Sequence, residues 1–112
     1  MFMIIFVLHD PDRLDQLLAA WEKAGVKGAT LIESTGIHSR KKVRVPMRYV
    51  FSGSSVQETG NVTIMTVVPD QEMVAKCLAA VEEVIGDLEK PNTGIFTAFP
   101  LTTGKGLKKS YQ

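Results

Sequence analysis

Residues 2–28, FMIIFVLHDPDRLDQLLAAWEKAGVKG, contain the clearest secondary-structure pattern of this chain. Residues 2–8 are apolar without interruption, which predicts a strand buried on both faces. Asp10 and Pro11 then predict the start of a helix, because Asp is a favoured N-cap and proline fits the first helical position. The helix ends at Gly25 and presents one apolar stripe to the core. That stripe comprises Leu14, Leu17, Leu18, Trp21 and Ala24.

The second half of the chain repeats this order of elements. A second strand is predicted at residues 29–34 and a third at residues 62–68, after which Asp70 starts a second helix. Residues 95–101 form the last strand, in which Pro100 indicates an end or a sheet edge. The apolar stripe of the second helix comprises Val74, Cys77, Leu78, Val81, Ile85 and Leu88.

Strand, helix and strand occurring twice predict a βαββαβ, ferredoxin-like fold of the α+β class. The pentapeptide LAAWE at 18–22 recurs as LAAVE at 78–82, which supports two similar halves. Right-handed crossovers place both helices on one face of a four-stranded antiparallel sheet and leave the other face open. We therefore expect a single domain over residues 1–112 that covers its open face by self-association.

Length and composition restrict the possible functions. A net charge of +1 argues against a general electrostatic attraction to nucleic acid or anionic membranes. Cys77 is the only cysteine, so no intrachain disulfide forms, and its place in a helical stripe predicts a small buried hydrophobe. The apolar run at residues 1–8 lacks a basic leader and is too short to span a bilayer. We expect a cytoplasmic protein that neither binds nucleic acid nor inserts into a membrane.

A long connection joins the two halves. Residues 35–61 contain the basic run SRKKVRVPMR at 39–48, followed by a short strand predicted at 49–51. Connections of this length inside a compact domain are commonly functional. The basic run is either an anion site or docking surface for an acidic partner, or simply a solvated loop. Residues 104–112 form a second basic segment at the end of the chain.

Other candidate sites are weaker. The turn PNTG, residues 91–94, either presents backbone N–H groups to an anion or is a plain turn between helix and strand. His9 and His38 have no Cys, His or carboxylate at metal-ligand spacing, so we expect no metal site. We find no catalytic Ser-His-Asp or Cys-His order and no phosphate-binding glycine motif, and expect a binding protein without catalytic residues. Trp21 is expected in the core.

The passage GVKGATLIESTG, residues 25–36, resembles the first helix-to-strand passage of the PII nitrogen-regulatory signalling family. Residues 67–70 look like the start of the family's second helix, and residues 92–96 lie where the family has a glycine-rich loop. The resemblance covers residues 3–104. It implies a homotrimer that binds an adenine nucleotide or a small anion such as 2-oxoglutarate between subunits. It also implies that the long loop after the second strand regulates a partner protein, in nitrogen or carbon metabolism.

The resemblance also implies functional residues. Thr30 matches the threonine that faces the nucleotide base, and Gly36 matches the glycine at the base of the long loop. The implied effector-binding residues are Thr30, Gly36, Ile37, Arg40, Lys41, Asn92, Thr93 and Gly94. The implied partner-docking residues of the loop are Lys42, Arg44, Arg48 and Tyr49.

The chain departs from the family pattern at several cations. Asn61 stands where a phosphate-binding lysine is usual, and Gly94 where the glycine-rich loop ends in lysine. The family's late arginine pair is absent, and so is the modified tyrosine in its usual setting. Because cations hold phosphates through charge-assisted hydrogen bonds, we expect an altered ligand rather than ordinary ATP sensing. Arg40 and Lys41 could replace the missing phosphate ligands.

Two other classes of protein remain open from the sequence. One is a trimeric metal-binding protein similar to the CutA divalent-cation-tolerance family, which shares this topology. The other is a small ferredoxin-like enzyme that acts on a minor metabolite. Titration with copper or zinc tests the first alternative, and turnover of a metabolite panel tests the second.

Overall fold

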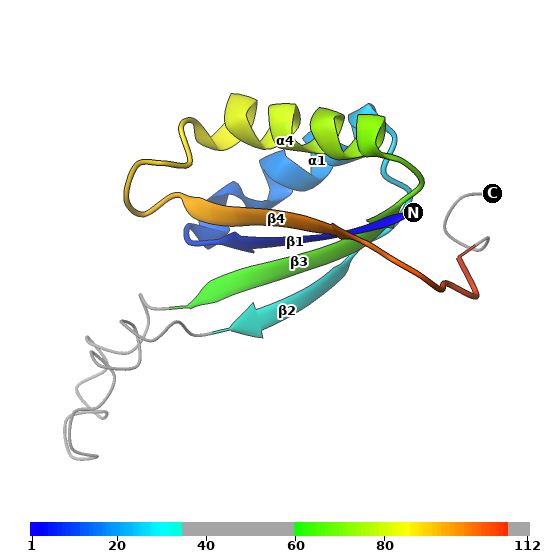
Figure 1. Ribbon diagram of the computed structural model, residues 1–112. Helices are drawn as coiled ribbons and strands as arrows, with labels where there is room; N and C mark the ends of the chain where they lie inside the picture. The colour runs from blue at the N-terminus through cyan, green and yellow to red at the C-terminus, as the bar shows by residue number, and fades with distance from the viewer. Residues whose placement is uncertain (35–59, 108–112) are drawn as a thin grey trace, which may run out of the picture.

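The computed structural model describes residues 1–34 and 60–107. In chain order its elements are β1 (Phe2–Leu8), the 3-10 turn η1 (Pro11–Arg13), α1 (Leu14–Ala24), β2 (Thr30–Ser34), β3 (Asn61–Val68), α4 (Gln71–Ile85) and β4 (Gly94–Pro100). The two helices lie side by side on the same face of one sheet (Figure 1). The predicted α+β, ferredoxin-like arrangement is confirmed. No helix of the described residues has the length and apolar character needed to cross a membrane.

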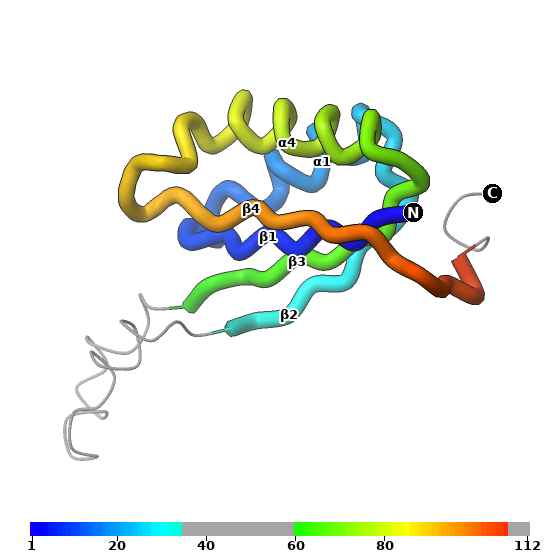
Figure 2. Tube along the Cα trace, viewed as in Figure 1, coloured from blue at the N-terminus to red at the C-terminus, as the bar shows by residue number. Residues whose placement is uncertain are grey.

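The sheet has the strand order β2-β3-β1-β4, and each neighbouring pair is antiparallel. Leu8 lies opposite both Val62 and Gly94, while Ser34 lies opposite Asn61. The end of β2 and the connection from α4 to β4 are therefore at the same end of the sheet, on its two opposite edges (Figure 2). At the other end the Leu101 N–H donates to the Met1 carbonyl oxygen at 2.9 Å.

The strand β1 is buried on one face only. Ile4, Phe6 and Leu8 are fully buried beneath the helices, whereas the residues between them are only partly buried. The strand β3 alternates in the same way. The prediction that β1 is buried on both faces is therefore wrong for the single chain, because both helices pack on the same side of the sheet.

A tryptophan joins the two helices in the core. Trp21 is buried in α1, and its indole N–H donates to the carbonyl oxygen of Cys77 in α4 at 3.2 Å. Leu17 and Val81 are fully buried in the same cluster. The predictions that Trp21 and Cys77 belong to the core are confirmed.

The first helix begins later than predicted. The Asp10 carboxylate accepts from the Asp12 N–H at 3.1 Å and caps a 3-10 turn instead of an α-helix. The α-helical backbone starts at Leu14. Gly25 ends the helix as predicted, with a φ of 116° that is left-handed and favours glycine.

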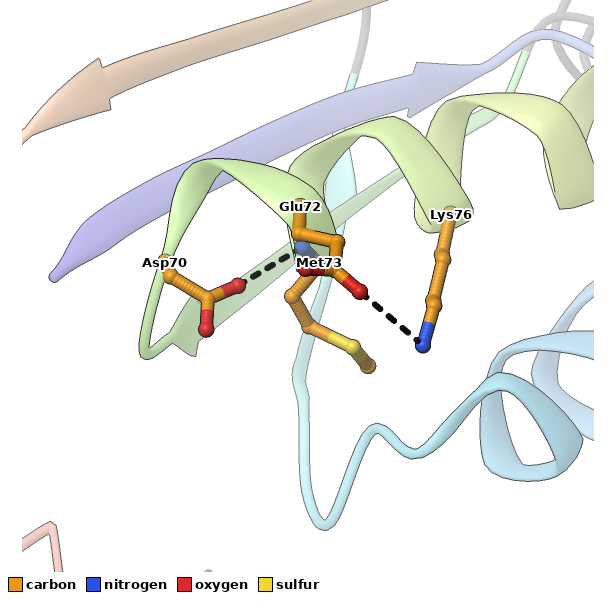
Figure 3. Close-up of polar contacts among 4 residues, drawn as sticks. All are labelled: Asp70, Glu72, Met73 and Lys76. Carbon is orange, nitrogen blue, oxygen red and sulfur yellow. Dashed lines mark hydrogen bonds and ion pairs between the residues drawn. The ribbon is translucent and has the colours of Figure 1, made fainter.

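The second helix begins as predicted and ends earlier. The Asp70 carboxylate accepts from the Met73 N–H at 2.9 Å, which satisfies one of the unpaired donors of the first turn (Figure 3). The helix ends at Ile85, and Gly86 follows with a φ of 102°. Leu88 therefore lies beyond the helix, although it still packs against the core.

The cap at Asp70 provides a test of what stabilises α4. Replacing Asp70 with Ala should lower the free energy of unfolding by about 1 kcal/mol, because the Met73 N–H loses its acceptor. Glu72 forms only an exposed ion pair with Lys76 at 3.8 Å, so Glu72→Ala should cost at most about 0.5 kcal/mol. Urea unfolding followed by circular dichroism measures both. Equal losses in the two variants would contradict the capping role.

Candidate functional site

A hollow of about 380 Å³ opens at the end of the sheet where β2 begins. We call it the Thr30 hollow. Its volume lies in the range of small-molecule sites, about 300–1,000 Å³. The lining residues come from β1, β2, β3, the turn before β2 and the C-terminal segment: Met3, Gly28, Ala29, Thr30, Met65, Thr66, Val67 and Leu107.

A buried threonine positions the turn that carries Thr30. Thr66 points to the helix side of β3, where it is 4% exposed, and its hydroxyl donates to the Gly28 carbonyl oxygen. A buried hydroxyl needs such a partner, and the bond holds the turn two residues before Thr30 against β3. The sequence analysis missed Thr66. The sequence does contain a signal for it, because Thr66 is a polar residue at a position of β3 where the alternating pattern places side chains in the core.

The Thr30 hollow is lined by uncharged side chains. Two thioethers and several aliphatic groups line it together with Thr30, and the Thr66 hydroxyl is already bonded to Gly28. Leu107 forms one wall, and the segment before it packs on Met1, where a side chain at Gly104 would lie 2.7 Å from the sulfur. The hollow therefore suits an uncharged ring or an apolar group, and the charges of an anion would need cations from elsewhere.

The turn at residues 92–94 lies at the opposite end of the sheet, and each of its residues has a structural role. Asn92 adopts a left-handed φ of 64°, which asparagine tolerates better than most residues. The Thr93 hydroxyl donates to the Lys90 carbonyl oxygen at 2.8 Å. A side chain at Gly94 would lie 2.6 Å from the carbonyl oxygen of Val7. A plain turn between helix and strand therefore accounts for the residue types at these positions. The binding of an anion by the backbone N–H groups of the turn stays a prediction.

The structure does not bring together, within one chain, the predicted effector residues that it describes. Thr30 begins β2 on one edge of the sheet and is level with Thr97 in the register, whereas Gly94 begins β4 on the other edge, three residues away along that strand. The remaining predicted site residues lie outside the described residues: Gly36, Ile37, Arg40, Lys41, Lys42, Arg44, Arg48 and Tyr49.

The face of the sheet away from the helices carries exposed apolar side chains on both edge strands in the single chain. We call it the open face. Ile32 in β2 is 46% exposed, and Ile95 and Phe99 in β4 are 54% and 43% exposed. Patches of this kind mark interaction surfaces. The register places these residues on the open face: Met3, Ile5, Val7, Thr30, Ile32, Ser34, Asn61, Thr63, Met65, Val67, Ile95, Thr97 and Phe99.

Titratable groups add little to the site. Within residues 1–34 and 60–107, no group of three or more His, Cys, Asp or Glu side chains is arranged to hold a metal ion. Cys77 is fully buried, and this burial raises the pKa of its thiol to about 11. The thiol is therefore protonated at neutral pH, and a protonated thiol is a poor nucleophile.

Comparison with known proteins adds no homologue to this picture. No protein-family model matches the chain, and no curated protein is significantly similar to it in sequence. The function is therefore inferred from the Thr30 hollow, the open face and the distribution of charge.

The state of Cys77 can be tested directly. At about pH 8 the native protein should react with a thiol reagent far more slowly than the urea-unfolded chain, because the thiol is buried and protonated. The absorbance released by a chromogenic disulfide measures the rate. Labelling of the native protein at the rate of the unfolded chain would show that the thiol is exposed.

Proposed function

We propose that this chain is a PII-like regulatory protein that assembles as a homotrimer and binds a small effector where copies meet. The observation that carries the proposal is the open face, whose apolar side chains stay uncovered in the single chain. Burying a large apolar side chain contributes about 1.5–3 kcal/mol, so a second and third copy would supply the missing cover. A domain of 112 residues also gains from the added burial.

The effector site of this proposal lies at the boundary between copies. The Thr30 hollow of one copy supplies an uncharged pocket, and the turn at Asn92–Gly94 of a neighbour supplies backbone groups. Arg40 and Lys41 supply the positive charge that the hollow lacks. An adenine nucleotide or a small anion such as 2-oxoglutarate has the matching chemistry. The site needs no metal, and the protein acts as a binding protein without catalytic residues.

The regulatory output of this proposal is the long loop. Its basic residues Lys42, Arg44 and Arg48, together with Tyr49, dock on an acidic surface of a regulated partner. The single, buried Cys77 agrees with a cytoplasmic setting, in which thiols stay reduced. Signal transduction in nitrogen or carbon metabolism is the role that the family resemblance suggests.

The assembly is tested by two adjacent residues of β2. Leu31 and Ile32 are 45% and 46% exposed, but the register places Leu31 on the helix side and Ile32 on the open face. Light scattering after size exclusion should give three times 12.3 kDa for the wild type and for Leu31→Lys, and a smaller mass for Ile32→Lys. A wild-type mass of 12.3 kDa would overturn the proposal.

The effector is tested by thermal shift with ATP, ADP, AMP, 2-oxoglutarate and bicarbonate. A ligand that binds the folded state should raise the melting temperature. Thr30→Val removes one hydroxyl and should weaken binding by about five-fold, the effect of one hydrogen bond. The double variant Arg40→Ala with Lys41→Ala should weaken an anionic ligand by at least about ten-fold.

The matched control removes two cations from the folded body, as Lys23→Ala with Lys90→Ala. It should leave the affinity unchanged because Lys23 does not line the Thr30 hollow, and Lys90, which holds the turn through its backbone carbonyl oxygen alone, keeps that bond to Thr93 in the alanine variant. Equal affinities of the Arg40 and Lys41 double variant and the wild type would remove these residues from the site. No shift with any of the five ligands would remove the proposed effector class.

A further inference from the structure

A second hollow, of about 400 Å³, lies between α4 and the start of β4. We call it the acidic groove. Leu78, Leu88 and Phe96 form an apolar floor, and the lining also includes Gly94 and Ile95. The other lining residues are the exposed carboxylates Glu82, Asp87 and Glu89, and none of the described residues that line the groove is Lys or Arg.

The charges of the chain are separated between its folded body and its long loop. Residues 1–34 and 60–107 contain eleven Asp and Glu against six Lys and Arg, a net charge of −5. Residues 35–59 contain five Lys and Arg against one Glu, a net charge of +4. The near-neutral total of +1 hides this separation. Opposite charges on one chain attract across distances comparable to the Debye length, about 10 Å.

We infer that the segment at residues 40–48 docks in the acidic groove of its own chain. The segment alternates cations with apolar residues, as in Lys42, Val43, Arg44 and Val45. Alternate residues of an extended chain point to opposite sides. One side of the segment then places valines on the apolar floor, and the other places cations beside the carboxylates of the rim.

The connection to β2 is long enough for this docking. Ser34 and the groove residue Gly94 lie at the same end of the sheet, on opposite edges (Figure 1). Three strand spacings separate these edges, about 14 Å. The six residues from Ser34 to Arg40 span up to about 20 Å when extended. The segment at residues 40–48 can therefore reach the groove without a second copy.

The other basic segment of the chain cannot reach the same groove. Leu107 lines the Thr30 hollow, at the end of the sheet opposite Gly94. The seven residues of β4 separate the two ends by about 23 Å. Lys108 and Lys109 follow Leu107 within about 7 Å of chain. The long loop is therefore the basic segment of this chain that fits the position of the groove.

Docking would give the body a self-inhibitory contact. Exposed charge pairs are individually weak and are screened by salt, so the docked state exchanges with a free one. The tether provides an effective concentration near about 1 mM, which compensates for weak contacts. While docked, Lys42, Arg44 and Arg48 are withheld from any other acidic surface. This inference depends on charge and reach, and it does not depend on the effector.

Paramagnetic broadening tests the inference in the full-length chain. A nitroxide is placed at Ser39→Cys, beside the proposed docking segment, and labelling of Cys77 is checked in the parent. At about 20 mM NaCl the amide signals of Leu88, Glu89 and Ile95 should lose at least half of their intensity, and at about 500 mM NaCl they should recover. Absence of broadening at low salt would overturn the inference.

Matched variants separate the groove from general charge. Glu82→Gln with Asp87→Asn and Glu89→Gln should abolish the broadening, whereas the control Asp12→Asn with Asp15→Asn and Glu22→Gln changes the charge equally and should retain it. Equal broadening in both triple variants would overturn the assignment to the groove. Lys42→Gln with Arg44→Gln and Arg48→Gln should also abolish it while leaving the folded body unchanged.

A mixed sample identifies which copy supplies the segment. Spin-labelled chains without ¹⁵N are combined with unlabelled ¹⁵N chains, exchanged through unfolding and refolding. The inference expects no broadening of the groove signals in this sample. Broadening would mean that a second copy occupies the groove, and this would overturn docking within one chain.

Discussion

The two helices of this chain cover one face of a sheet whose central strand β1 is apolar on both faces. Buried side chains of β1 and β3, such as Phe6 and Ile64, pack under α1 and α4. Their neighbours in sequence point to the other side, where the single chain buries them only partly. Exposed apolar surface opposes folding in a small domain. The face of the sheet that the helices leave uncovered is therefore the part of the surface that would gain most from a further contact.

The two hollows of the molecule lie toward opposite ends of the sheet. At one end, the start of β2, Thr66 and the C-terminal segment frame an uncharged hollow. At the other end, β2 finishes, β4 begins and carboxylates surround a second hollow.

Much of the fold could be predicted from local patterns. Asp70 and Gly25 have the side chain and the backbone freedom that a helix cap requires, and the structure uses both as predicted. The number of buried faces of β1 could not be predicted, because an apolar run has the same pattern whether helices or other copies cover it. The end of α4 before Leu88 could not be predicted either, because Leu88 lies beyond the helix and still packs on the core.

The candidate site was also only partly predictable, because some of its residues become neighbours only in the folded chain. Thr30 could be selected by resemblance, and it does line a hollow. Thr66 acts through a turn 38 residues away in sequence, a separation that no local pattern reveals. The acidic groove combines residues of α4 and of the segment after it with the start of β4, which the fold places beside them.

The contact between Trp21 and Cys77 also has a spectroscopic consequence. The chain contains one tryptophan, so its ultraviolet fluorescence comes almost entirely from the seam between α1 and α4. Trp21 lines neither hollow. Its emission wavelength therefore reports separation of the helices with little interference from molecules bound at either end of the sheet, and this provides an internal standard for the integrity of the folded body.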